Sequence, residues 1–248
     1  MALKAGIVGL PNVGKSTLFN CLSSAKAQAA NFPFCTIDAQ MGQITVPDER
    51  LNKLAELVHP GRVVPATCDI VDIAGLVKGA SKGEGLGNQF LGNIRETDAI
   101  IHVLRCFDND NIVHVDGSVD PVRDIEIITT ELVLSDLQSC EKQLESNVRK
   151  AKGMDKEAIK NVELLTKLVA HLDSGKPAIT LPDVSDEDAA RIKSYFLLTS
   201  KPVIYACNVG EDDLLGGLDE NPYFPLVAAR AKEENAQAIP ICAKSEED

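Results

Sequence analysis

An octapeptide near the start of the chain constrains the fold more than any other feature. Residues 9–16 read G-L-P-N-V-G-K-S, which matches the pattern G-x-x-x-x-G-K-[ST]. The octapeptide follows an apolar run at residues 5–9 and leads into a helical pattern at 15–23. A glycine-containing turn between a strand and a helix directs backbone N–H groups and the helix dipole at phosphate oxygens. Residues 9–16 are therefore predicted to form a phosphate loop.

The residues of this phosphate loop have expected roles. We expect the Lys15 amine to bridge the β- and γ-phosphates of a nucleotide, which also makes it a candidate catalytic residue. The Ser16 hydroxyl is expected to bind Mg²⁺. The predicted nucleotide-binding residues of the loop are Asn12, Val13, Gly14, Lys15, Ser16 and Thr17.

Short apolar runs alternate with helical patterns through the first hundred residues and again near the end of the chain. This alternation is typical of a parallel sheet with crossover helices. We expect an α/β fold with a doubly wound, mostly parallel sheet of the P-loop NTPase (G-domain) type, which binds ligands beyond the carboxyl ends of its strands. The predicted strands are 5–9, 42–46, 66–73, 100–105, 203–208 and 238–242, and the predicted helices are 15–23, 48–58, 89–97 and 222–234.

The alternation stops between about residue 120 and residue 201. Apolar residues there recur at helical spacing in two stretches, 137–148 and 158–172. This spacing predicts one apolar seam on each of two helices, and residues 152–155 suit a reversal between them. We expect an inserted antiparallel helical hairpin, a coiled coil. The predicted domains are a nucleotide-binding domain of residues 1–128 and 200–248 and a helical domain of residues 129–199.

The turn of this hairpin is basic, although the whole chain is acidic. The chain has 25 Lys and Arg against 37 Asp and Glu, a formal net charge of −12. This balance argues against a general polyanion-binding surface and allows a local one. Residues 149–160, the hairpin tip, hold five basic and two acidic residues. A solvated helix end and a contact with a nucleic-acid backbone are both open interpretations.

Two further segments are expected to contact Mg²⁺ and phosphate. Asp72 and Gly75 belong to D-I-A-G, which follows a predicted strand. A carboxylate at a strand end can hold Mg²⁺ through water, and a glycine N–H can contact the γ-phosphate. Thr36 lies in a proline-interrupted segment, where its hydroxyl can move onto Mg²⁺ when a γ-phosphate is bound. The predicted metal ligands are Ser16, Thr36 and Asp72.

A glycine-rich run gives the most specific signal in the chain. Residues 79–91, G-A-S-K-G-E-G-L-G-N-Q-F-L, together with the phosphate loop and D-I-A-G-L, resemble the Obg superfamily of P-loop nucleotidases. Residues 31–37, 95–98 and 106–115 and the helical insertion look like its YchF branch, the Obg-like ATPases. The resemblance spans essentially the whole chain. It implies an ATP-hydrolysing regulatory switch whose partner is the ribosome. With that partner, the basic tip at 149–160 is expected to contact rRNA.

The resemblance also bears on chain length. Members of this family usually continue into a C-terminal TGS domain, and this sequence stops before one could begin. We therefore expect the chain to be a fragment of a longer protein.

Residues 208–211, N-V-G-E, stand where a guanine-specific nucleotidase carries N-K-x-D. Val209 lacks the lysine stem that covers the base, and Glu211 is one methylene longer than aspartate, so strong selection for guanine is not expected. An asparagine amide can pair with N6 and N7 of adenine. We expect Asn208 to do so, with the Val209 backbone facing the Watson–Crick edge and Glu211 nearby. ATP is therefore predicted to bind more tightly than GTP.

Hydrolysis requires a group that orients the attacking water. Many relatives carry glutamine after D-x-x-G; Leu76 stands there in this chain, so intrinsic turnover should be slow. His114 follows a polar loop at the carboxyl end of a predicted strand and is the expected catalytic histidine, with a loop histidine of no role as the alternative. An asparagine at the position of Asn12 accompanies K⁺ use in some related nucleotidases, so K⁺ is a possible second cation. A comparison of turnover in K⁺ and Na⁺ at equal ionic strength would test this.

Three functions stay open after this reading. The preferred one is a Mg²⁺-dependent ATPase that acts as a switch; the alternatives are a true GTPase and a non-catalytic, nucleotide-gated adaptor, which Leu76 favours. Seven cysteines form no C-x-x-C pair, and no apolar run approaches the roughly 18 residues of a membrane span. These features predict reduced thiols, a cytoplasmic location and no membrane partner.

Overall fold

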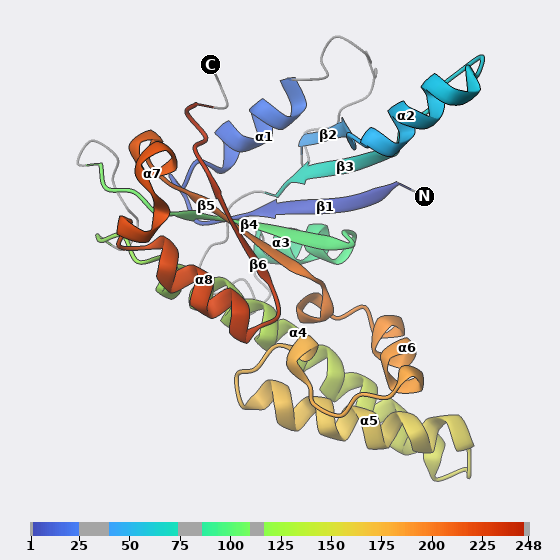
Figure 1. Cartoon of the computed structure of the whole chain (residues 1–248). Helices are drawn as coiled ribbons and strands as arrows, with labels where there is room; N and C mark the ends of the chain where they lie inside the picture. The colour runs from blue at the N-terminus through green and yellow to red at the C-terminus, as the bar shows by residue number, and fades with distance from the viewer. Residues whose placement is uncertain (1, 25–39, 74–85, 110–116, 246–248) are drawn as a thin grey trace.

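A six-stranded sheet forms the centre of the molecule (Figure 1). The computed structural model describes residues 2–24, 40–73, 86–109 and 117–245. In this part of the chain the strand order is β2-β3-β1-β4-β5-β6, and β2 pairs antiparallel with β3 while the other neighbours are parallel. This confirms the predicted mostly parallel sheet. The strands are β1 (Leu3–Val8), β2 (Gln40–Thr45), β3 (Thr67–Asp72), β4 (Ala99–Arg105), β5 (Val203–Asn208) and β6 (Gln237–Ile241).

All six predicted strands are present, with ends shifted by one or two residues at most. The predicted helices 15–23, 48–58, 89–97 and 222–234 correspond to α1, α2, α3 and α8, and the last of these starts two residues later than expected. The α-helices are α1 (Lys15–Ser24), α2 (Glu49–Val58), α3 (Leu86–Arg95), α4 (Pro121–Ala151), α5 (Lys156–Asp173), α6 (Asp186–Ser194), α7 (Glu211–Gly216) and α8 (Phe224–Glu233). Short 3-10 helices are η2 (Ala178–Thr180), η3 (Leu198–Ser200) and η4 (Leu218–Glu220).

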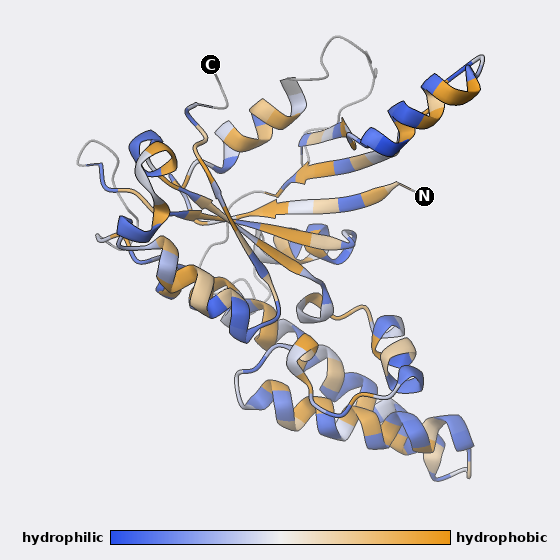
Figure 2. Cartoon of the chain, viewed as in Figure 1, coloured by the Kyte–Doolittle hydropathy of each residue, from blue (hydrophilic) through white to orange (hydrophobic). Residues whose placement is uncertain are grey.

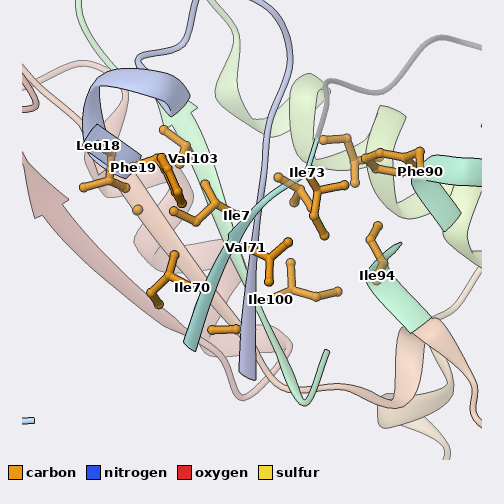
Figure 3. Close-up of a cluster of buried hydrophobic side chains, with 14 of the residues drawn as sticks. Ile7, Leu18, Phe19, Ile70, Val71, Ile73, Phe90, Ile94, Ile100 and Val103 are labelled. Carbon is orange, nitrogen blue, oxygen red and sulfur yellow. The ribbon is translucent and has the colours of Figure 1, made fainter. Parts of the chain in front are cut away.

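Alternation along the strands divides the core between the two faces of the sheet (Figure 3). Ile70 of β3 lies on the side of α1, near Leu18 and Phe19, whereas Val71 and Ile73 lie on the side of α3. Successive side chains of a strand point to opposite faces. Asp72 therefore shares the face of Ile70, which directs it toward the start of α1.

Helices α4 and α5 pack against each other and are joined by residues 152–155, the predicted reversal (Figure 1). Helix α4 starts at Pro121, which lies before the predicted boundary between the nucleotide-binding domain and the helical domain, placed between residues 128 and 129. Its first turns are part of the sheet core, because Ile125 and Ile128 are buried against strand residues. One continuous helix thus runs from the sheet into the hairpin, and the two-domain division stays a prediction.

Helix α6 was not predicted from the apolar spacing. It is short, and Ile192 is the buried residue within it. Ile192 belongs to the same buried cluster as Leu164 and Leu168 of α5 and Tyr195. The start of α6 does carry a sequence signal, because the Ser185 side chain accepts a hydrogen bond from the backbone N–H of Asp188 and three acidic residues follow.

A buried carboxylate fixes the return from the hairpin to the sheet. Asp136 of α4 is fully buried and accepts hydrogen bonds from the backbone N–H groups of Leu198 and Thr199, both at 2.8 Å, and from the Thr199 hydroxyl at 2.7 Å. Burial raises the pKa of Asp136 above its ordinary value, against these hydrogen bonds, which act to lower it. Helix α4 is therefore tied directly to the segment that leads into β5.

Hydropathy follows this architecture (Figure 2). Hydrophobic residues are concentrated in the strands, and hydrophilic residues are frequent at the far end of the hairpin. In the described ranges, no helix has both the length and the apolar character needed to cross a membrane.

Candidate nucleotide-binding site

The phosphate loop connects β1 to α1 at the carboxyl edge of the sheet. Val13 is buried under the loop, whereas the Asn12 and Ser16 side chains are exposed and Thr17 is half-buried. Asn12 and Gly14 have φ values of 65° and 95°, in the left-handed region. At Gly14 a Cβ atom would overlap the amide nitrogen of Asn208, so this position requires glycine for both its backbone angle and its contact.

Two predicted site residues meet directly. The Lys15 amine forms an ion pair with the Asp72 carboxylate, and their side chains are only 12% and 15% exposed. The structure therefore brings together the motif at the start of α1 and the strand end of β3. A bound phosphate would give the Lys15 amine a negative partner in place of the Asp72 carboxylate. A bound cation would give Asp72 a positive partner in place of the Lys15 amine. Lys15 can transfer from carboxylate to phosphate while Asp72 transfers from ammonium to Mg²⁺, so that neither charge is left unpaired.

Asn208 joins three segments at the end of β5. Its side chain is buried; Nδ2 donates to the Val13 carbonyl at 3.0 Å, and Oδ1 accepts from the Ala243 N–H at 3.0 Å. The sequence predicted that this amide pairs with adenine. In the structure both of its ends bind main-chain groups, so the geometry favours a positioning role that holds the phosphate loop. The pairing with adenine would have to share these bonds, and it stays a prediction.

The other residues of the 208–211 segment contribute main-chain groups. The Val209 side chain is buried, and its N–H donates to the Ile241 carbonyl at 2.8 Å. That N–H is therefore already used, which makes the Val209 carbonyl the main-chain group to consider for a base. Gly210 donates its N–H to Asp213 Oδ2 at 3.0 Å, and Glu211 is exposed at the start of α7.

Three predicted residues, Thr36, Gly75 and His114, lie outside the described residues, so their roles stay predictions. His102, which the sequence placed inside a strand, is buried in β4 beside the Tyr205 ring. Burial lowers the pKa of His102 to about 3, which keeps the ring neutral near pH 7.

The sequence reading missed Asn221 and Asp213. Asn221 is 3% exposed and hydrogen-bonds to Asp213, the residue that receives the Gly210 N–H. Asn221 directly precedes a proline at the predicted start of a helix, and asparagine is favoured at helix starts. That signal points to the turn before α8, where Asn221 Oδ1 accepts from the Tyr223 and Phe224 N–H groups, whereas its contact with Asp213 depends on the folded chain.

A phosphate loop between β1 and α1, a lysine paired with the aspartate at the end of β3, and a mostly parallel sheet define a P-loop nucleotidase of the GTPase-domain class. Residues 4–131 match the family model of the 50S ribosome-binding GTPase. The chain is 53% identical, over 248 residues, to the ribosome-binding ATPase YchF of Escherichia coli O157:H7. It is 50% identical, over the same length, to the protein of that name from Bacillus subtilis. The chain belongs to the YchF family of P-loop nucleotidases.

A solved structure supports this assignment. The Schizosaccharomyces pombe YchF GTPase is 41% identical and superposes with a TM-score of 0.80 over 99% of this chain. The chain covers 66% of that protein and 67% of each of the two bacterial relatives. It therefore spans about two thirds of the length of the relatives that it matches.

Proposed function

We propose that this chain binds Mg²⁺–ATP at the phosphate loop, hydrolyses it to ADP and phosphate, and acts as a cytoplasmic switch on the ribosome. The single observation that carries the nucleotidase part is the Lys15–Asp72 pair at the start of α1. The bacterial relatives are named ribosome-binding ATPases, and the solved relative is named a GTPase. These names support the ribosomal partner and leave the choice of purine to experiment.

The described residues divide the work of binding in this proposal. Lys15 and the N–H groups of the phosphate loop hold the phosphates, while Ser16 and Asp72 hold Mg²⁺, which neutralises charge on the phosphate oxygens. Asn208 keeps the loop in shape through Val13. Beyond the described residues, we assign Thr36 to Mg²⁺, Gly75 to the γ-phosphate and His114 to the attacking water. Unchanged turnover in His114→Ala would remove the last role.

The proposed preference for adenine rests on the main chain at Val209. Its N–H is bonded to Ile241, so its carbonyl is the group to face the base. A carbonyl accepts hydrogen bonds, which matches the N6 amino group of adenine and opposes the O6 acceptor of guanine. Two facing acceptors repel each other, and a desolvated acceptor without a donor is costly.

We therefore expect ATP to bind at least about tenfold more tightly than GTP in the presence of Mg²⁺. Calorimetric titration of the same protein with each nucleotide measures this ratio, and EDTA in place of Mg²⁺ is the control for metal dependence. Equal or tighter binding of GTP would contradict the proposal and favour the true GTPase. A phosphate-release assay on the same samples separates an ATPase from a non-catalytic adaptor.

The hairpin tip is the proposed contact with rRNA. Lys160 is paired with Glu187 of α6 at 2.7 Å, and Arg149 lies 4.0 Å from Glu145 of the same helix. Lys150, Lys152 and Lys156 are the other basic residues of the tip, and their side chains are exposed. These three lysines are therefore the best placed to meet phosphate groups.

Changing Lys150, Lys152 and Lys156 to glutamine is expected to weaken association with ribosomes and to lower the slope of log K against log salt by about two units. Sedimentation binding at several KCl concentrations measures both quantities. The matched control changes three exposed lysines of the same helical region away from the tip, Lys167, Lys176 and Lys193. An equal effect in the control would show that only net charge matters, and it would remove the tip from the proposal.

A further inference from the structure

One buried amide connects three elements next to the 208–211 segment. Asn221 lies between η4 and α8 and is 3% exposed. Its Nδ2 donates to the Cys106 carbonyl beyond β4 at 3.0 Å and to Asp213 Oδ2 at 2.9 Å. Its Oδ1 accepts from the N–H groups of Tyr223 and Phe224 at 2.9 and 2.8 Å. Two donors and two acceptor positions are all the amide has, so it is fully used and fixed in orientation.

Asp213 links Asn221 to residues 208–210, the proposed base-binding segment. The same Oδ2 that receives Asn221 also accepts the Gly210 N–H at 3.0 Å. Cys106, whose carbonyl accepts from Asn221, also donates its own N–H to the Asn208 carbonyl at 2.8 Å. Residues 208–210 are therefore held on the β4 side by the hydrogen bonds of Cys106 and Asp213, and on the β6 side by the bond from the Val209 N–H to Ile241.

The orientation of one peptide group follows from the Asp213 contact. In a trans peptide the C=O and the N–H point in opposite directions. An ionised carboxylate can only accept hydrogen bonds, so Asp213 fixes the N–H of the Val209–Gly210 peptide toward itself and the carbonyl toward the opposite side. If this peptide turned over, a donor would replace the acceptor. A donor in that place would match O6 of guanine instead of the amino group of adenine.

We propose that Asp213, held by Asn221, is a positioning residue that determines purine selectivity. It keeps the Val209 carbonyl directed at the position-6 group of a bound purine, which favours an amino group there over a carbonyl oxygen. The proposal rests on the proposed function, since it requires a purine nucleotide in this site. Asp213 itself touches neither the base nor the phosphates in this scheme.

The test is the variant Asp213→Ala, titrated with Mg²⁺–ATP, Mg²⁺–GTP and Mg²⁺–tripolyphosphate, which has no base. We expect the ATP-to-GTP affinity ratio to fall about tenfold, because the peptide is no longer fixed by a charge-assisted hydrogen bond. Tripolyphosphate affinity should stay within about twofold, since the phosphate loop is untouched. Asp213→Asn retains an acceptor oxygen and should restore most of the ratio. Asp212→Ala removes the same charge from an exposed neighbour and should change none of these affinities.

Two results would overturn the proposal. An unchanged ATP-to-GTP ratio in Asp213→Ala would show that the peptide is fixed by other contacts. A matching loss of tripolyphosphate affinity would show that Asp213 supports the whole site and not the base segment. Failure of the proposed function would give a different result, because the parent chain itself would bind neither purine nucleotide in the presence of Mg²⁺. The selectivity role of Asp213 would then be excluded as well.

Discussion

Alanine in place of Lys15 is expected to lower ATP turnover at least about hundredfold, the scale seen when one well-placed charge-stabilising donor is removed from a site. The amine is the charged group of the phosphate loop, and it lies beside the carboxylate that we assign to Mg²⁺. Its loss leaves the γ-phosphate without its ammonium partner. Phosphate release at saturating Mg²⁺–ATP measures the effect.

A second measurement on the same variant separates binding from folding. Ligand that binds only the folded state raises the melting temperature, so Mg²⁺–ATP should stabilise the parent chain and stabilise Lys15→Ala much less. Lys53→Ala, which changes an exposed lysine on α2, is the matched control and should behave like the parent. Turnover within a few-fold of the parent in Lys15→Ala would exclude the phosphate loop as the catalytic site.

Alanine in place of Gly14 is expected to weaken Mg²⁺–ATP binding by about a hundredfold or more without any change of charge. An alanine here would have to adopt the left-handed backbone conformation of Gly14, which costs of the order of 1–2 kcal/mol. Its Cβ atom would also overlap the Asn208 amide. Either the loop shifts or Asn208 gives up its bond to Val13. Calorimetry with Mg²⁺–ATP, together with thermal unfolding of the free protein, measures both consequences.

The control for this variant is another glycine in a different setting. Gly92 lies in α3, and a Cβ there would have no neighbour within 4 Å. Gly92→Ala should therefore leave nucleotide binding unchanged and stabilise the helix by about 0.5–1 kcal/mol. Binding by Gly14→Ala at the parent affinity would mean that the loop does not hold phosphate in the observed conformation.

Local patterns in the sequence were enough to predict the sheet and the approach of Lys15 to Asp72. Strands show as apolar runs because both faces of a parallel sheet are buried. Lys15 and Asp72 each belong to a short motif at a strand end, and the carboxyl ends of parallel strands share one edge. Their meeting could therefore be expected without knowledge of any long-range contact.

What escaped prediction depends on contacts between distant segments. The main-chain contacts of Asn208 were not predicted, because its partners, Val13 and Ala243, are 195 and 35 residues away along the chain. Asp136 shows no sequence pattern, since its donors lie 62 and 63 residues later. The early start of α4 was different: an aspartate followed by proline is a local helix-start signal, and Asp120 does cap the helix at Arg123.

The continuity of α4 gives the molecule a lever. The helix has 31 residues, which at about 1.5 Å per residue makes a rod of roughly 46 Å. Its first turns rest on the sheet, and its last turn carries Arg149 and Lys150. Asp136 also ties the helix to the segment before β5, so the arm beyond this anchor is about 15 residues or roughly 23 Å long, and a tilt of about 5° would move its end by about 2 Å. A partner bound at the far end would thus be displaced by any change in the tilt of α4 against the sheet.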